Sequence, residues 1–437
     1  MLTEQENQEI TQVGPGTLMG GLFREYWVPF LPSADLEADG RPKRVRLLGE
    51  DLIAFRDTNG DVGLIDKVCA HRGAPLFFGR NEECGLRCVY HGWKYDVRGT
   101  VVDTPAEPER SRFKDRVTMK SYQVRERNGI LWAYLGPATE PPELPRLEWN
   151  LVPAERVHVS FRVQQANWLQ CLEGEIDSAH APILHGRVDG EGFFATSLAS
   201  ADLRPVFDCV QTDSGVSVAA RRRLPDGQVY WRVNQFVMPF YSLVPPQARH
   251  PELSGHAWVP MDDEHTLCIM FTYHPTEPLP ERMREVFTEG VNGRESGHPS
   301  RHAFVSGDAG RPYAGYWPKF TMENDYLYDP ELEKKYFSGI PGLWLQDAGC
   351  QSGFGPVQDR TRENLCVSDA GIIMTRRYLL DAARGLRDAG VRPPTLSDPG
   401  LTMVRAVSLR LDDGVSWTEA GREPMRAVVG AGWGYEI

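Results

Sequence analysis

Four residues in the first quarter of the chain place one thiol and one imidazole on each of two short segments. Cys69 and His71 form a C-x-H motif, and after sixteen intervening residues Cys88 and His91 form a C-x-x-H motif. Two facing loops with these side chains can hold a tetrahedral zinc ion, or a 2Fe-2S cluster in which one iron binds both cysteines and the other both histidines. Neutral imidazoles in place of two thiolates raise the reduction potential of such a cluster. The cluster interpretation therefore implies one-electron transfer.

A second set of metal-ligand residues lies further along the chain. Asp177 and His180 are three residues apart, on one face of a predicted helix, and His185 follows five residues later, beyond Pro182. Pro182 interrupts the regular helical turn, so both imidazoles can still converge on one ion. Two histidines and one carboxylate on one face of an octahedral Fe(II) site leave open positions for dioxygen beside a substrate.

The local sequence does not fix which carboxylate completes this second set. Glu173, Glu175 and Asp177 all lie near the two histidines in the sequence. Asp347 is a distant alternative, because it ends the apolar run 342–346, where a predicted strand would carry it into a core. Buried carboxylates seldom occur without a partner or a metal ion.

The elements around the first set are predicted to be short antiparallel strands. Residues 43–67 alternate apolar runs with turns and include an Asn-Gly pair, which is a strong hairpin signal. Further strands are predicted at 93–97 and 130–135. The Pro-rich segment 136–145 lacks any periodicity and is interpreted as a linker, so the first domain comprises residues 1–145.

The second domain, residues 146–437, is predicted to be α+β. A helix is expected at 167–180, and a longer one at 368–389, where an apolar stripe recurs at helical spacing and stops at a glycine. The Gly-rich segment 289–318 has no periodicity and is expected to be either a functional lid or locally disordered. Strands of an antiparallel sheet are predicted at 156–163, 216–223, 228–237, 255–260 and 265–273.

The composition excludes several classes of protein. The 437 residues include 48 Lys and Arg against 60 Asp and Glu, a net charge of −12, so no nucleic-acid partner is expected. No stretch approaches the ~18 apolar residues of a transmembrane helix, and the N-terminus lacks the order of a signal peptide, so we expect a cytoplasmic protein without a membrane partner. Eight cysteines are too sparse for a disulfide framework, and the closely spaced ones are interpreted as metal ligands, with Cys84 left over.

The segments around both sets resemble those of a known family. Residues 69–76 and 88–96 resemble the two ligand loops of Rieske proteins. Nearly the whole chain resembles the catalytic (alpha) subunit of Rieske non-heme iron aromatic ring-hydroxylating oxygenases, close to the phthalate dioxygenase-like group. The resemblance implies an α+β fold with an N-terminal all-β Rieske 2Fe-2S domain, which includes an N-terminal helical segment, and a C-terminal catalytic domain with an antiparallel sheet of the helix-grip type.

The resemblance also implies roles for both sets of ligands. One 2Fe-2S cluster per subunit would be held by Cys69, His71, Cys88 and His91, and one Fe(2+) by His180, His185 and Asp347. Asp177 would be the bridging, catalytic carboxylate that hydrogen-bonds His91 of a neighbouring subunit and carries electrons between the centres. The resemblance also implies a head-to-tail homotrimer, with a heterologous ring interface. Many relatives have Asn where this chain has Glu173, whose role the sequence does not define.

The implied reaction is hydroxylation of an aromatic carboxylate, such as a phthalate- or benzoate-type compound, with O2. The chain shows no flavin or nicotinamide fingerprint, so a separate flavin/iron–sulfur reductase is expected to supply electrons from NADH or NADPH. Dihydroxylation and monooxygenation both remain open, as does O-demethylation of a methoxylated aromatic acid at the same iron. A Rieske electron carrier or a zinc-ribbon binding module is the alternative from another class, although neither needs the second set of ligands.

An arginine is expected to bind the carboxylate of such a substrate. Arg221, Arg222 and Arg223 lie on a predicted strand, so Arg222 points to the face opposite to the other two. Arg222 is therefore the candidate substrate residue, and the alternative is that it is one of three solvated strand arginines.

Overall fold

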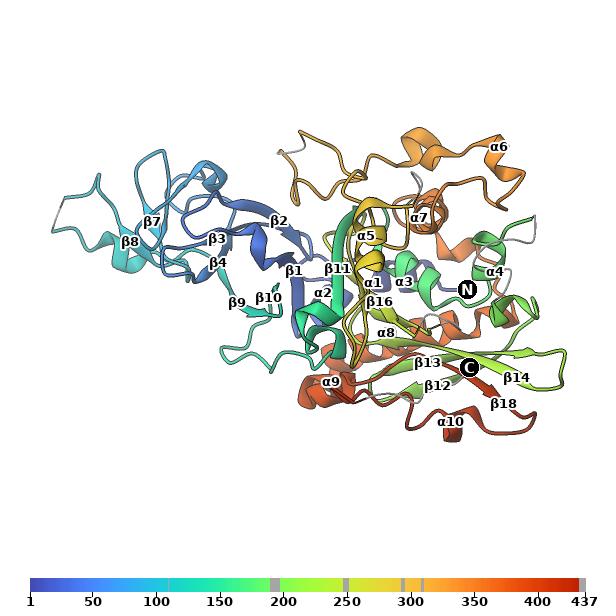
Figure 1. Ribbon diagram of the computed structural model, residues 1–437. Helices are drawn as coiled ribbons and strands as arrows, with labels where there is room; N and C mark the ends of the chain where they lie inside the picture. Colours follow the sequence, from blue (N-terminus) through green and yellow to red (C-terminus); the bar gives the residue numbers. More distant parts are fainter. Residues whose placement is uncertain (109, 189–196, 247–250, 292–294, 308–309, 432–437) are drawn as a thin grey trace.

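The computed structural model in Figure 1 describes residues 1–108, 110–188, 197–246, 251–291, 295–307 and 310–431. The described residues form two large antiparallel sheets and a third, much smaller sheet. No helix in these residues combines the length and the apolar character that crossing a membrane requires.

The first sheet is built from the N-terminal part of the chain. Its six strands lie in the order β1-β10-β9-β4-β3-β2. They are β1 (Trp27–Pro32), β2 (Lys43–Leu47), β3 (Glu50–Arg56), β4 (Val62–Asp66), β9 (Ser121–Arg127) and β10 (Ile130–Tyr134). The strands predicted within 43–67 and at 130–135 are confirmed, and the turn between β3 and β4 has Gly60 at a φ of 89°, which favours glycine.

The small sheet lies between β4 and β9 in the sequence and frames the two N-terminal ligand segments. Its strands lie in the order β5-β6-β7-β8. They are β5 (Arg80–Asn81), β6 (Leu86–Arg87), β7 (Lys94–Tyr95) and β8 (Val101–Asp103). Only two residues of the strand predicted at 93–97 therefore pair. Both ligand segments are loops, one between β4 and β5 and the other between β6 and β7.

The second sheet frames the C-terminal part of the chain. Its strands lie in the order β11-β17-β16-β15-β14-β13-β12, and β18 pairs with β14 beside that path. They are β11 (Val157–Gln164), β12 (Val206–Thr212), β13 (Gly215–Arg223), β14 (Val229–Val237), β15 (Tyr241–Val244), β16 (Leu253–Pro260), β17 (Thr266–Tyr273) and β18 (Val407–Leu411). All five strands predicted for this sheet are confirmed.

The helices pack mainly on the second sheet. The long helix α8 (Ala370–Ala389) contacts β12 and β13 and ends at Gly390 in the left-handed conformation, which confirms the helix predicted at 368–389. The N-terminal helices α1 (Glu4–Thr11) and α2 (Leu18–Arg24) pack against α8. The remaining helices are α3 (Trp168–Ile176), α4 (Ala181–Leu184), α5 (Glu281–Glu289), α6 (Pro330–Glu333), α7 (Leu343–Gly353), α9 (Pro394–Ser397) and α10 (Trp417–Ala420).

The helix predicted at 167–180 is shorter than expected. α3 ends at Ile176, and Asp177 has an extended backbone with φ −75° and ψ 108°. A new short helix, α4, begins at Ala181 with Pro182 in its first turn, a position that suits proline. Asp177 and His180 therefore do not share one face of a continuous helix, as predicted, but lie in the connection between α3 and α4.

The strand predicted at 342–347 is wrong, because this segment begins helix α7. Its buried apolar residues Trp344, Leu345 and Ala348 recur at helical spacing. A short apolar run alone does not distinguish a strand from a buried helix. The segment 289–318 contains no strand and no helix beyond the end of α5 among its described residues, as its lack of periodicity predicted.

Candidate active site

The two N-terminal ligand loops share one backbone design. In each loop the cysteine carbonyl accepts a hydrogen bond from a glycine N–H four residues later, with N···O distances of 2.9 Å for Gly73 to Cys69 and 3.0 Å for Gly92 to Cys88. Both glycines have positive φ, 76° and 77°. A side chain on Gly92 would also collide with Pro105, because an added Cβ would lie 2.5 Å from its Cγ. Two equivalent turns therefore present equivalent cysteines and histidines.

The side chains of these loops fit a cluster with buried sulfur and outward nitrogen ligands. Cys69 and Cys88 are buried, His71 is exposed, and the rings of His71 and His91 have centroids 4.6 Å apart. Burial raises the pKa of the Cys88 thiol, and its neighbour Cys69 raises it further. Two buried thiols on facing loops can both bind a metal once they lose their protons. The Tyr95 hydroxyl lies 3.0 Å from the Cys69 sulfur and supports this side of the site.

His180, His185 and Asp347 meet at a second site. One ligand atom from each lies within 4.8 Å of the others. The Asp347 Oδ1 atom is 3.5 Å from His180 Nε2 and 3.3 Å from His185 Nε2. The two histidines flank α4 and Asp347 comes from α7, so the structure brings together the three predicted iron ligands, with Asp347 on a helix instead of a strand.

Neighbouring side chains orient both imidazoles. Gln346 Nε2 donates to the Ile340 carbonyl at 3.0 Å, so its Oε1 atom accepts from His185 Nδ1 at 2.7 Å. His185 Nε2 then keeps its lone pair for a metal ion. Asp177 Oδ2 lies 3.3 Å from His180 Nδ1 and orients that ring in the same way. Gln346 was not predicted from the sequence, although this residue directly precedes Asp347.

The electrostatics of the three ligands fit a bound cation. Burial alone would lower the pKa of His180, but Asp177 and Asp347 raise it to about 10. Burial would raise the pKa of Asp347, whereas the two imidazoles hold it far below the usual range. The metal-free protein thus favours a positive charge at this point, and two nitrogens with one carboxylate form the facial ligand set of Fe(II) oxygenases.

The other two carboxylates of the 173–177 segment have different partners. Glu173 is buried and forms ion pairs with Arg360 at 3.0 Å and Arg376 at 2.5 Å, so it is not a metal ligand. These two arginines clamp the last turn of α3, which gives Glu173 a structural role.

Glu175 points to the floor formed by the second sheet. Its carboxylate lies 2.6 Å from His256 Nδ1 and accepts hydrogen bonds from Ser242 Oγ at 2.5 Å and Trp258 Nε1 at 3.1 Å. Burial alone would lower the pKa of His256, but the Glu175 carboxylate, with Cys268, raises it to about 9. Glu175 is therefore the partner of a protonated histidine.

A cavity of about 590 Å³ opens onto the three iron ligands. Its floor includes Arg232 and Asn234, which are two residues apart on β14 and face the same side of the sheet. Arg232 is buried, and its guanidinium forms no hydrogen bond or ion pair with the described residues. Arg162 on β11 also lines the cavity, with its guanidinium 5.1 Å from the centre of the Trp344 ring.

Arg222 occupies a different place from the one predicted. It is fully buried, as strand alternation predicted, so the alternative of a solvated arginine is wrong. Its guanidinium donates to the Ser178 carbonyl at 2.6 Å, and it does not belong to the described lining of the cavity. Burial and the nearby charge of Arg232 lower the pKa of Arg222 to about 10. Arg232 on the adjacent strand, unlike Arg222, lines the cavity.

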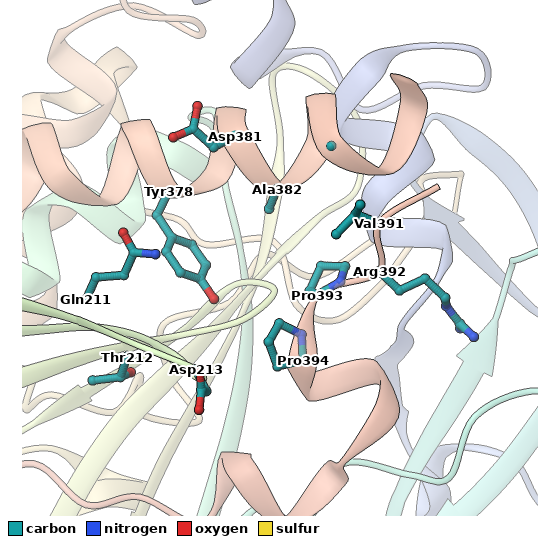
Figure 2. Close-up of a pocket in the computed structure, with 11 residues that line it drawn as sticks. Gln211, Thr212, Asp213, Tyr378, Asp381, Ala382, Val391, Arg392, Pro393 and Pro394 are labelled. Atoms are coloured by element: carbon teal, nitrogen blue, oxygen red, sulfur yellow. The ribbon is translucent and has the colours of Figure 1, made fainter. Parts of the chain in front are cut away.

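The loop predicted as a functional lid contributes little to this cavity. Gly297 is the only described residue of 289–318 that lines it. A second, smaller cavity of about 200 Å³ lies between α8 and the segment before α9 (Figure 2). Tyr378 extends into it from α8, whereas Asp381 points away. Among the described residues it offers no cluster of metal ligands.

Comparison with known proteins gives the same result as the two sites. Residues 26–123 match the Rieske [2Fe-2S] domain family, and residues 133–408 match the family of LigXa C-terminal domain-like sequences. The chain therefore belongs to the Rieske non-heme iron oxygenases, whose cofactors are a 2Fe-2S cluster and a mononuclear Fe(2+). A Rieske electron carrier or a zinc-ribbon module is thereby excluded.

Several relatives are similar over most of their length. The chain is 38% identical to the oxygenase subunit of 3-chlorobenzoate-3,4-dioxygenase from Comamonas testosteroni, over 91% of this chain and 92% of that protein. It is 36% identical to the oxygenase subunit of phthalate 4,5-dioxygenase from Pseudomonas putida, over 87% and 86%. The terminal oxygenase of carbazole 1,9a-dioxygenase from Novosphingobium sp. KA1 has the same fold, with a TM-score of 0.54, 21% identity and coverage of 87% and 96%.

Proposed function

We propose that this enzyme hydroxylates an aromatic carboxylate beside His180, His185 and Asp347. The observation that carries the proposal is Arg232, a buried cation that has no acidic partner among the described residues and lies on the wall of a largely apolar cavity that opens onto these ligands. Burying a charge is costly unless it is paired, and a carboxylate supplies both the opposite charge and two acceptor atoms. Two of the relatives named above act on benzoate- or phthalate-type acids, which supports the same class.

The side chains of the chain have distinct roles in this proposal. When bound, the cluster supplies single electrons and the Fe(2+) offers open positions for O2. Gln346 and Asp177 hold the imidazoles of His185 and His180 in place. Arg232 fixes the carboxylate end of the substrate, and the apolar walls exclude water from its ring. Electrons come from a separate flavin/iron–sulfur reductase that oxidises NADH or NADPH.

The two metal sites of one chain lie far apart in the molecule. β7, which follows His91 in the sequence, is at the left end of the view in Figure 1, whereas α4 and α7 lie in its right half. We therefore propose a head-to-tail homotrimer in which Asp177 of one subunit hydrogen-bonds His91 of the next. The Asp177 side chain is 24% exposed, and the His91 ring is half-buried, so both can reach a neighbour. Native mass spectrometry tests this arrangement, and a monomeric holoenzyme would contradict it.

The proposed reaction is tested with the iron-loaded protein, a reductase and a panel of phthalates, benzoates and methoxybenzoates. Analysis should first find about three irons and two sulfides per chain, the sum of one cluster and one mononuclear site. Mass spectrometry then distinguishes addition of O2 and two hydrogens, addition of one oxygen, and loss of a methyl group as formaldehyde. A fully loaded preparation that oxygenates none of these acids would refute the proposal.

A further inference from the structure

The cavity is much larger than a single-ring acid requires. A benzene-sized ring fits a space of roughly 150 Å³, and the cavity measures about 590 Å³. A benzoate held at Arg232 would therefore leave most of the cavity to other groups. The chemistry of the walls beyond the ring then decides which substituents the enzyme accepts.

One of these walls is formed by helix α5. Met283, Val286 and Phe287 of α5 line the cavity and are half-buried, although α5 has no fully buried residue. Three apolar side chains of one short helix thus face the cavity, and they keep solvent-accessible surface that a ligand can cover. In contrast, Glu285 of the same helix is exposed and does not line the cavity.

The helix is anchored at the β11 end of the sheet. Arg284 Nη2 donates to the Glu155 carbonyl at 2.5 Å, just before β11 begins. The Phe287 ring packs on His298 and on His158 of β11, with centroid distances of 4.3 Å and 5.2 Å. These contacts hold the apolar face of α5 in a fixed position.

Arg232 lies toward the opposite end of the sheet floor. It is on β14, and three strands, β17, β16 and β15, separate β14 from β11. With ~4.8 Å between neighbouring strands, β14 and β11 are roughly 19 Å apart along a flat sheet, and curvature of the sheet shortens the straight-line distance between them. Figure 1 shows α5 beside β11 near the centre of the view, whereas β14 lies at the lower right. The cavity therefore extends from Arg232 to the apolar side chains of α5, with the predicted iron ligands also on its wall. Arg282 of α5 and Arg162 of β11 line it as well.

We infer that the enzyme selects aromatic carboxylates that carry a second ring, or an apolar group of similar size, directed away from the carboxylate bound at Arg232. Met283, Val286 and Phe287 are then the residues that determine specificity for this group. The inference rests on the proposed function, because Arg232 defines the end that binds the carboxylate.

Equilibrium binding to the metal-loaded enzyme tests the inference. Calorimetry compares benzoate with biphenyl-3-carboxylate, and we expect the two-ring acid to bind at least about tenfold more tightly, because burying a phenyl group against apolar side chains is worth that much. Val286→Phe fills the space at α5 and should abolish this advantage while benzoate affinity stays within about twofold. Glu285→Phe adds the same bulk outside the cavity and should leave both dissociation constants unchanged.

The outcomes separate this inference from the proposed function. If neither acid binds, the proposed function fails, and the inference fails with it. If benzoate binds as tightly as biphenyl-3-carboxylate, or if Val286→Phe and Glu285→Phe have equal effects, only the inference is overturned. Should Val286→Phe not fold, Val286→Ala replaces it, with biphenyl-3-carboxylate bound several-fold more weakly and benzoate unchanged as the expected result.

Discussion

Replacing Arg232 with leucine tests the carboxylate site most directly. The guanidinium is buried and forms no hydrogen bond or ion pair with the described residues, so its removal breaks no internal contact of that kind. The free energy of unfolding should therefore not fall. A substrate carboxylate, however, would lose its buried cation. Loss of one member of a buried charged pair costs about 2–5 kcal/mol, which corresponds to a rise in the dissociation constant of about 30-fold to a few thousand-fold.

A matched pair of ligands and a matched variant isolate the charge. Calorimetry with benzoate and with neutral benzamide should show the large loss for benzoate only, because benzamide carries no charge for Arg232 to balance. Arg223→Leu makes the same change on the adjacent strand, where the side chain is exposed, and should leave benzoate binding unaltered. Arg222→Ala should have an intermediate effect, since its charge lies behind Ser178 and reaches the cavity only at a distance.

Two results would refute the proposal that Arg232 binds the substrate carboxylate. If Arg232→Leu binds benzoate as well as the unmodified enzyme, the carboxylate is held elsewhere on the cavity wall. Equal losses for benzoate and benzamide would also refute it, because they would indicate a change of cavity shape and not of charge.

Three further predictions concern the iron site and the cavity floor. Asp177→Asn should keep both metals but slow single-turnover product formation, and an unchanged rate would remove Asp177 from the electron path. Gln346→Leu frees His185 to turn and should weaken iron binding by about 10- to 100-fold, measured by titration with a chelator, while cluster absorbance stays constant. The Glu175–His256 pair should stabilise the fold below about pH 6.5, and this stabilisation, on the order of 3 kcal/mol, should disappear as the pH rises through about 9, because the pKa of His256 is raised in the folded protein. Urea unfolding of Glu175→Gln should lack that pH dependence, and an unaltered dependence would assign it to other groups.

The sequence predicted both groups of candidate metal ligands because most of their signal is local. Cys69, His71, Cys88 and His91 lie in two short loops, and a spacing of two or three residues already restricts where the side chains can go. Asp347 lies beside His180 and His185, as its proposed role requires, but its element was predicted wrongly, because six residues with an apolar bias fit a buried strand and a buried helix equally well. The ligand could thus be predicted from its chemistry even though its backbone could not.

Arg232, the proposed substrate residue, was not predicted, because strand alternation places Arg222 and Arg232 of one hairpin on the same face of the sheet. Arg222 pairs with Tyr230 on the neighbouring strand, and Arg232 pairs with Ala220, so both arginines face the same side of the sheet. Only tertiary structure places Ser178 over Arg222 and leaves Arg232 facing the cavity. The available signal was the lone charge of Arg232 in a strand that is otherwise uncharged, which implies either a buried partner or a ligand.

The segment from Glu173 to His180 links the substrate cavity to the metal. Arg360 and Arg376 fix Glu173, so the end of α3 has one position. Two residues later Glu175 holds His256 on the cavity floor, and two residues after that Asp177 holds His180. Because Glu173 is held by two arginines, the contacts that position His256 on the cavity floor and His180 at the metal site come from one anchored segment, at side chains only two residues apart.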